Sequence, residues 1–303
     1  MIDRRRFTAG LLASTGAALA LPVETSAQMA GEDARLMELF RDDARREDAL
    51  DPLSGLYRGG DANVAAFRQL YTDLPLRAAR ASIAQSLKAL ARIDRARLSP
   101  ERQVSYDAFL LAKRQDALWL RPDMVALSAV RPFNHFGGFH VEFPSLMAKG
   151  GVVRYETEQD YRAALALLQA FPQVLGNATA RFRQGLASGV VETRLTTANM
   201  IAQIDALLAA RFADSPFLSA IASFPDAIPA ASRASLKSGF ENAVNQGILP
   251  AYRRLRDFLA DEYLPSAREA VGIAAMKGGS TYYAAAIARH TTLRLSPDAV
   301  HQL

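Results

Sequence analysis

Apolar residues recur every three to four positions through most of the chain after about residue 32, and clean alternation of apolar and polar residues is scarce. This spacing places apolar side chains on one face of an α-helix, whereas a half-buried strand requires alternation. Leu36, Leu39 and Phe40 form one such stripe, and residues 83–90 hold another. The pattern therefore predicts an all-α fold, a multi-helix array packed through its apolar faces.

Two kinds of helix-start sequence support these elements. Ser99 precedes Pro100, and the same order recurs at 296–298. Serine is a good N-cap residue, and proline is tolerated at the first helical position. Thr157 stands three residues before Asp160, which resembles a capping box. We therefore expect helices to begin close to these three places.

Prolines indicate where helices are interrupted. Pro172 divides the apolar pattern over 158–188, so we expect two helices that meet there. Pro250 lies inside the pattern that covers 230–263. Because proline has no backbone N–H to continue the helical hydrogen bonds, we expect a kink or a split near Leu249.

The segment 131–151 has a different character. It is rich in glycine and aromatic residues and poor in helical spacing, so we interpret it as one ordered Gly/aromatic-rich loop with a short strand-like stretch. His135, His140 and Glu142 in this loop are residue types that bind metal ions, and they define a candidate loop site. The alternative is that they only pack and form hydrogen bonds, since the chain has no HExxH pattern.

A second candidate site lies near the end of the chain. The turn before residue 282 is rich in glycine, and backbone N–H groups at a helix start can hold an anion or a carboxylate. Tyr283 and His290 are seven residues apart, so both can face one side of the following helix. Gly279, Tyr282, Tyr283 and His290 are therefore candidate substrate-binding residues. The alternative is a plain turn followed by core packing.

Composition excludes several classes of protein. Of the 303 residues, 50% are hydrophobic and 22% are charged, which is typical of a globular chain, and the net charge of +5 is spread along helices beside acidic residues. We therefore expect no nucleic-acid partner. The chain has no cysteine, which excludes disulfides, thiolate metal ligands and a lipid-bearing N-terminal cysteine.

The N-terminus is interpreted as an export signal. Arg4, Arg5 and Phe7 resemble the twin-arginine motif, with Arg5 and Arg6 as a less suitable pair, and the general secretory route remains an alternative. The apolar run that follows is too short and too weakly apolar for a stable membrane span. Small residues ending at Ala27 form the expected cleavage site.

The expected organisation is therefore a signal peptide over 1–27 and one helical domain over 28–303. The twin-arginine export machinery is the implied partner, and the implied location is periplasmic or secreted. A last helix begins near residue 297 and is cut off after about two turns, so we expect the helical domain to be incomplete at its C-terminus.

The C-terminal third carries a series of residues that resembles one bacterial family. The series comprises Pro250-Ala251-Tyr252, Phe258-Leu259, Glu262-Tyr263-Leu264-Pro265, Ala267-Arg268, Gly272, Gly279, Tyr282-Tyr283, His290-Thr291-Thr292 and the segment 295–301. It resembles the family catalogued as domain of unknown function 885. The resemblance covers roughly residues 32–303 and is most specific after about residue 240.

The resemblance implies the N-terminal part of a larger zincin-like helical fold, in exported or lipid-anchored proteins that look like zinc metallopeptidases related to helical carboxypeptidases. The family's HExxPGHH zinc motif would lie beyond residue 303, so no zinc ligand or catalytic residue is carried over. The implied function is a cleft wall that is inactive alone, with zinc and a peptide substrate belonging to a full-length relative. The alternative is a complete, non-catalytic periplasmic binding or scaffold protein.

The export motif gives a first prediction. Replacing Arg4 and Arg5 together by Lys keeps the charge but removes the twin-arginine pattern, so the protein should accumulate inside the cell. Immunoblots of periplasmic and cytoplasmic fractions measure this. Arrival of the double variant in the periplasm at the wild-type level would show that another route exports the protein.

Overall fold

The computed structural model describes residues 23–303, with side chains from residue 28 onward, and in this part of the chain the only β-type pairing is two isolated bridges. The expectation of an all-α fold is confirmed. The helices are α1 (Val23–Leu50), α2 (Val64–Phe67), α3 (Asp73–Leu90), α4 (Pro100–Trp119), α5 (Pro122–Ser128), α6 (Phe139–Met147), α7 (Glu158–Ser188), α8 (Arg194–Ala209), α9 (Ala230–Asn242), α10 (Leu249–Asp257), α11 (Gly279–Thr291) and α12 (Pro297–His301). Two π-helical turns, η6 (Ala243–Ile248) and η7 (Phe258–Tyr263), flank α10.

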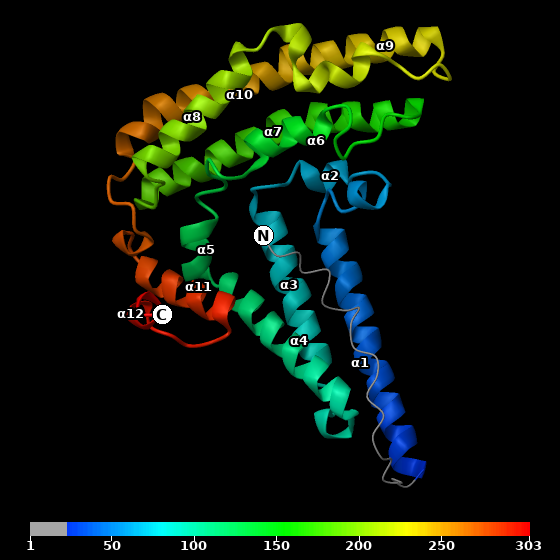
Figure 1. The fold of residues 1–303 in the computed structure, drawn as a ribbon, viewed down its shortest axis with the longest axis vertical. Coiled ribbons are helices and arrows are strands. Elements are labelled where there is room, and N and C mark those ends of the chain that lie inside the picture. Colours follow the sequence, from blue (N-terminus) through cyan, green and yellow to red (C-terminus); the bar gives the residue numbers. More distant parts are fainter. Residues whose placement is uncertain (1–22) are drawn as a thin grey trace.

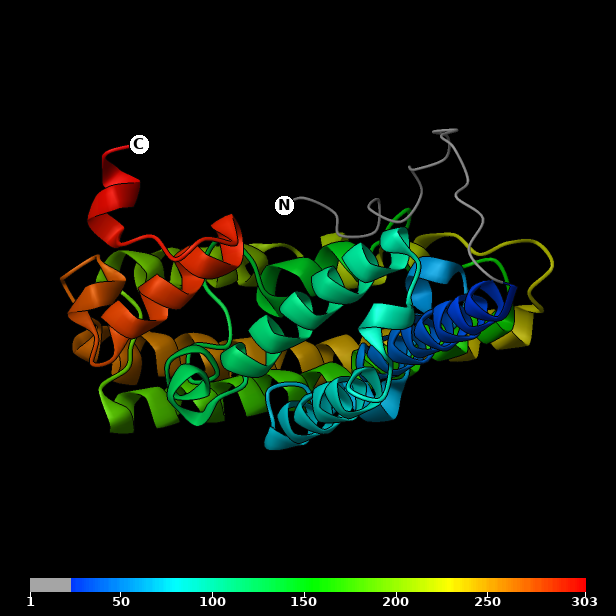
Figure 2. The same ribbon diagram turned by 90° about the horizontal axis from the view of Figure 1, so that it is seen from below.

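The helices form an elongated layer and an arm (Figure 1). The layer contains α6 to α10, and the arm is the bundle of α1, α3 and α4. Figure 2, which views the molecule from below, shows α11 beside the end of α4, where the Gln115 side-chain amide donates to the Ala288 carbonyl over 3.4 Å. The chain therefore returns to the arm after it has built the layer.

The main core surrounds α7, which is 31 residues long and packs against α2, α9, α10 and η6. Phe171 on α7 is fully buried, and its ring stacks on Phe143 of α6 with centroids 3.9 Å apart. Each fully buried side chain of this size contributes about 1.5–3 kcal/mol. The layer is therefore held mainly by apolar side chains that several helices present to α7.

The predicted loop over 131–151 is partly wrong, because Phe139–Met147 forms α6. This helix is only nine residues long, follows two glycines and contains Pro144, so its sequence lacks the length of regular spacing that marks a helix, although it buries Phe143 and Met147 and packs on α8. Pro144 lies inside it and cannot donate to the His140 carbonyl, which instead accepts the Tyr252 hydroxyl over 2.9 Å. A contact from α10 therefore satisfies the backbone group that proline leaves unpaired.

The predicted break at Pro172 is also wrong, since α7 is continuous through it. A proline inside a helix costs about 3 kcal/mol. The flanking residues Phe171 and Val174 are fully buried, and the Pro172 ring lies against Gly247, where a Cβ would come within 3.3 Å of its Cγ. Burial on both sides of the proline outweighs its local cost.

Two other boundary signals are confirmed. Thr157 and Asp160 form a reciprocal capping box at the start of α7. At Leu249, where a kink or a split is expected, the chain stays helical, and the hydrogen-bonding pattern changes from the π turn η6 to the α-helix α10. Ser296 caps α12 by accepting the Ala299 backbone N–H over 3.1 Å.

The arm is tied together by a buried polar cluster. Lys113 of α4 pairs with Asp43 of α1 over 2.6 Å, and it also contacts Glu47. The Ser86 hydroxyl of α3 donates to Asp43 as well. Burial alone would lower the pKa of Lys113, but hydrogen bonds to the two carboxylates outweigh it and raise the pKa. The lysine therefore stays charged and joins two helices of the arm.

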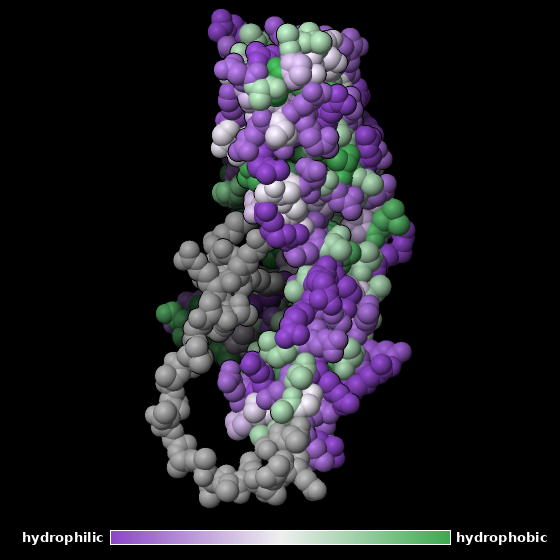
Figure 3. Space-filling view, turned by 90° about the vertical axis from the view of Figure 1, so that its right-hand side faces the viewer, coloured by the Kyte–Doolittle hydropathy of each residue, from purple (hydrophilic) through white to green (hydrophobic). Residues whose placement is uncertain are grey.

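Hydrophilic side chains dominate the face on the right-hand side of Figure 1, as the space-filling view shows (Figure 3). Within residues 23–303, no helix combines the length and the apolar composition needed to cross a bilayer. The export-signal residues Arg4, Arg5 and Phe7 lie outside the described residues. The backbone of the predicted cleavage residue Ala27 falls within α1, but its side chain is not among those described.

The cluster in the arm gives a second prediction. Lys113→Met leaves the buried Asp43 carboxylate without its main counter-charge and should lower the free energy of unfolding by about 3–5 kcal/mol. Urea denaturation measures the change. Lys88→Met, which removes an exposed lysine from α3, is the matched control and should have little effect. Adding Asp43→Asn to Lys113→Met should recover part of the loss, and a further equal loss would argue against the pairing.

Candidate functional site

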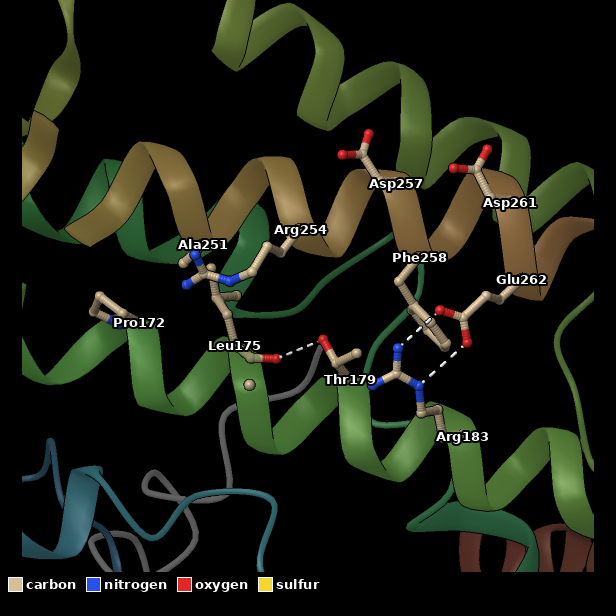
Figure 4. Close-up of a pocket in the computed structure, with 11 residues that line it drawn as sticks. Pro172, Leu175, Thr179, Arg183, Ala251, Arg254, Asp257, Phe258, Asp261 and Glu262 are labelled. Carbon is tan, nitrogen blue, oxygen red and sulfur yellow. Dashed lines mark hydrogen bonds and ion pairs between the residues drawn. The ribbon is translucent and has the colours of Figure 1, made fainter. Parts of the chain in front are cut away.

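A groove lies between α7 and the segment formed by α10 and η7, with a volume of about 400 Å³ (Figure 4). We call it the α7–α10 groove. Its apolar lining comes from Pro172, Leu175, Ala251 and Phe258, beside Gly176, and its polar lining comes from Thr179, Arg183, Arg254, Asp257, Asp261 and Glu262. The groove therefore combines an apolar floor with charged groups of both signs.

Two local features of the sequence keep the groove open. Gly176 has no side chain, and a Cβ placed there would have no atom within 4 Å, so this part of α7 leaves space. Phe258–Tyr263 forms a π turn, which changes the direction of successive side chains relative to an α-helix. Such turns are rare and often occur at functional sites.

One end of the groove is closed by an ion pair. Arg183 of α7 donates two hydrogen bonds to Glu262, over 3.2 and 2.8 Å. The guanidinium carbon also lies 4.9 Å from the centre of the Phe258 ring. The hydrogen bonds from Arg183 lower the pKa of Glu262, so this carboxylate stays ionised. Arg183 and Glu262 thus neutralise each other's charge.

Arg254 has a different environment. Its exposed side chain projects into the groove beside Ala251 and Leu175 (Figure 4). Within the described residues its guanidinium has no ion pair, whereas the nearby Arg256 pairs with Asp205 over 2.9 Å. Arg254 is therefore the lining cation that is not already matched by a carboxylate in the described part of the chain.

The other polar groups of the lining are hydrogen-bond acceptors. The Thr179 hydroxyl donates to the Leu175 carbonyl over 2.9 Å, so its oxygen can only accept from a further group. Asp261 is exposed, and no cation of the described residues pairs with it. Asp257 has a long contact of 3.5 Å with Arg256. The groove thus offers one unmatched cation and several acceptors.

The four residues predicted to bind substrate near the chain end do not line this groove. Gly279 is buried, and a Cβ there would lie 1.8 Å from the Ile273 carbonyl oxygen, so this position requires glycine. Tyr282 packs edge-on against Trp119 at 4.7 Å. Tyr283 is half-buried, while His290 is exposed. Their proposed role in substrate binding stays a prediction.

The candidate loop metal residues contact other groups of the protein, and Gln203 lies against two of them. His140 is buried, stacks on Phe133 and contacts the Gln203 side-chain oxygen through Nε2 over 3.1 Å. Glu142 accepts the Gly138 backbone N–H over 2.9 Å, while the His135 carbonyl accepts the Gln203 amide over 2.8 Å. Among the residues described, no group of three or more His, Asp or Glu side chains is arranged to hold a metal ion.

The sequence interpretation missed the groove. Arg254, Asp257 and Asp261 recur at helical spacing, and Pro250 lies at the start of their helix. These signals predict a charged helix face, which is ordinarily only solvated. The missing information was that this face lies beside Gly176 and Thr179, which are distant in sequence.

The fold and the groove define an all-helical protein with a mixed-charge groove along its central helix. The chain belongs to the family described as "Bacterial protein of unknown function (DUF885)", whose model matches residues 52–303. The resemblance noted from the sequence is therefore confirmed at the level of the family. No curated protein matches the chain.

A solved structure has the same fold. It is titled "The crystal structure of the putative lipoprotein from Colwellia psychrerythraea" and aligns with a TM-score of 0.73 at 18% sequence identity. The alignment covers 89% of this chain and 48% of that chain. At this identity the likeness shows the fold alone, and this chain spans about half the length of the solved one.

The burial of His140 gives a third prediction. Burial lowers its pKa from 6.5 to about 4, although the contact with Gln203 acts in the opposite direction. Between these values the unfolded chain binds the proton more readily than the folded chain. The contribution of the neutral His140 ring to the free energy of unfolding should be fully present above pH 6.5. It should fall by on the order of 3 kcal/mol as the pH decreases to about 4.

Urea denaturation across this pH range measures the effect. His140→Gln removes the titrating ring but retains an amide that can meet Gln203, so the loss at low pH should be much smaller. His290→Gln removes an exposed ring and serves as the control. Because His135 and Glu142 remain in both variants, an unchanged pH dependence in His140→Gln would assign the loss to other groups.

Proposed function

We propose that this chain is the peptide-binding, cleft-wall portion of an exported zinc-metallopeptidase-like protein and that the α7–α10 groove is where it binds a short peptide. The observation that carries the proposal is the composition of the groove. An apolar floor beside an unmatched guanidinium and several acceptors complements a peptide, which has apolar side chains, N–H donors and charged ends.

Family membership supports a shared architecture, and the sequence resemblance supports the link to helical metallopeptidases. The described residues themselves do not fit a zinc site, because no group of three or more His, Asp or Glu side chains among them is arranged to hold a metal ion. Zinc ligands and the attacking water would therefore be supplied by other residues of a full-length protein. The part proposed for this chain is to bind and orient the peptide.

Export is supported by two observations of different kinds. The twin-arginine pattern at Arg4 and Arg5 is typical of exported proteins. The solved structure with the same fold is titled a lipoprotein, which describes that protein. We propose on these grounds that the protein is periplasmic or secreted.

The alternative function is a non-catalytic periplasmic binding or scaffold protein. The groove favours ligand binding under either reading, since binding does not depend on whether a catalytic portion is attached. The two readings differ in whether this fold works with hydrolytic residues. Hydrolysis and binding must therefore be measured separately on the same preparation.

The fourth prediction tests both. The purified chain should bind tri-alanine saturably in isothermal titration calorimetry. With zinc added, it should show no peptide hydrolysis that is sensitive to a chelator. Mass spectrometry of the products measures this. Chelator-sensitive turnover would contradict the inactive state proposed for the isolated chain. A lack of saturable binding by any short peptide would contradict the binding function.

A further inference from the structure

We infer that the α7–α10 groove binds a free peptide of about three to four residues in one direction, with its carboxylate on Arg254 and its amino end at Asp261. This inference rests on the proposed function and adds the polarity and length of the ligand. It follows from which polar groups of the groove are already occupied and which are not.

The carboxylate position is assigned by comparing the arginines beside the groove. Arg183 is held by Glu262 through two hydrogen bonds, and Arg256 is held by Asp205. Arg254 has no ion pair within the described residues, and its side chain lies over the apolar floor in Figure 4. A guanidinium forms paired hydrogen bonds with a carboxylate, so Arg254 is the favoured anchor for an anionic group.

The amino position is assigned by the acceptors. Asp261 is an exposed carboxylate on the same side of the groove, and the described residues place no cation in pairing distance of it. Between the two ends, the Thr179 oxygen can accept a hydrogen bond from a ligand N–H because its own proton is used by Leu175. A cationic amino end and amide donors match these groups.

The length follows from helix geometry. Arg254 and Asp261 are seven positions apart on one helical segment, α10 followed by the π turn η7, so an α-helical rise of about 1.5 Å per residue places their Cα atoms at most about 10 Å apart along the axis. An extended peptide advances about 3.3–3.6 Å per residue. Three to four residues therefore match the spacing of the two Cα atoms along the segment.

Another carboxylate source has to be considered. A medium-chain fatty acid also combines a carboxylate with an apolar body and would satisfy Arg254 and the floor. A fatty acid has no hydrogen-bond donor for Thr179 and no cation for Asp261, so it would leave both of these acceptors without a partner. The pattern of acceptors therefore favours a peptide.

The experiment uses tri-alanine with free ends, tri-alanine amide, N-acetyl-tri-alanine and octanoate as probes, each titrated into the purified full chain by calorimetry. Removing either terminal charge should weaken binding to the wild-type chain by about tenfold. Octanoate should bind more weakly than tri-alanine. These results would establish that both ends of the peptide are read.

Variants assign each end to a residue. Arg254→Gln should lose about tenfold in affinity for tri-alanine and should no longer distinguish it from its amide. Asp261→Asn should no longer distinguish tri-alanine from its N-acetyl form. Arg253→Gln is the matched control, because Arg253 is an exposed neighbour that does not line the groove. Circular dichroism confirms that each variant is folded.

The possible failures are distinguishable. If peptides bind but the wild-type chain does not discriminate against the amide or the N-acetyl form, the assigned polarity is wrong while peptide binding stands. If Arg253→Gln loses as much affinity as Arg254→Gln, the carboxylate is not held at Arg254. Equal or tighter binding of octanoate overturns the peptide assignment, and no binding by any probe overturns the proposed function as well.

Discussion

Burial of α7 is the constraint on which the rest of the structure depends. This helix is 31 residues long, and side chains on several of its sides, such as Phe171 and Val174, are fully buried. Other helices must therefore lie along it, and α9, η6 and α10 do so end to end. The groove lies where this coverage is incomplete, beside Gly176 of α7 and along α10.

Buried polar groups fix how the helices meet. The hydroxyl of Tyr252 supplies the donor that Pro144 denies to the His140 carbonyl, which joins α10 to α6. In the arm, Lys113 is charged and paired with Asp43, so α1 and α4 cannot slide past each other without exposing an unmatched charge. Apolar burial supplies most of the stabilisation, while these contacts select one arrangement.

The candidate site shows where sequence interpretation loses information. The charges at Arg254 and Asp261 are visible in the sequence, but an exposed helix face has the same pattern whether it is solvated or lines a groove. His140 and Glu142 illustrate the opposite case. Their spacing marked them as candidate metal residues, and only the structure shows that His140 contacts Gln203 and that Glu142 accepts the Gly138 backbone N–H.

The sequence by itself determined the helical class, the capped start at Thr157 and the family. These depend on local hydrogen bonding and on residue order, which the sequence contains directly. Only the tertiary structure decided that 139–147 is a helix and that α7 runs through Pro172. In both places, burial between distant segments outweighs a local preference of a few kcal/mol, and that burial depends on neighbours that the local sequence does not identify.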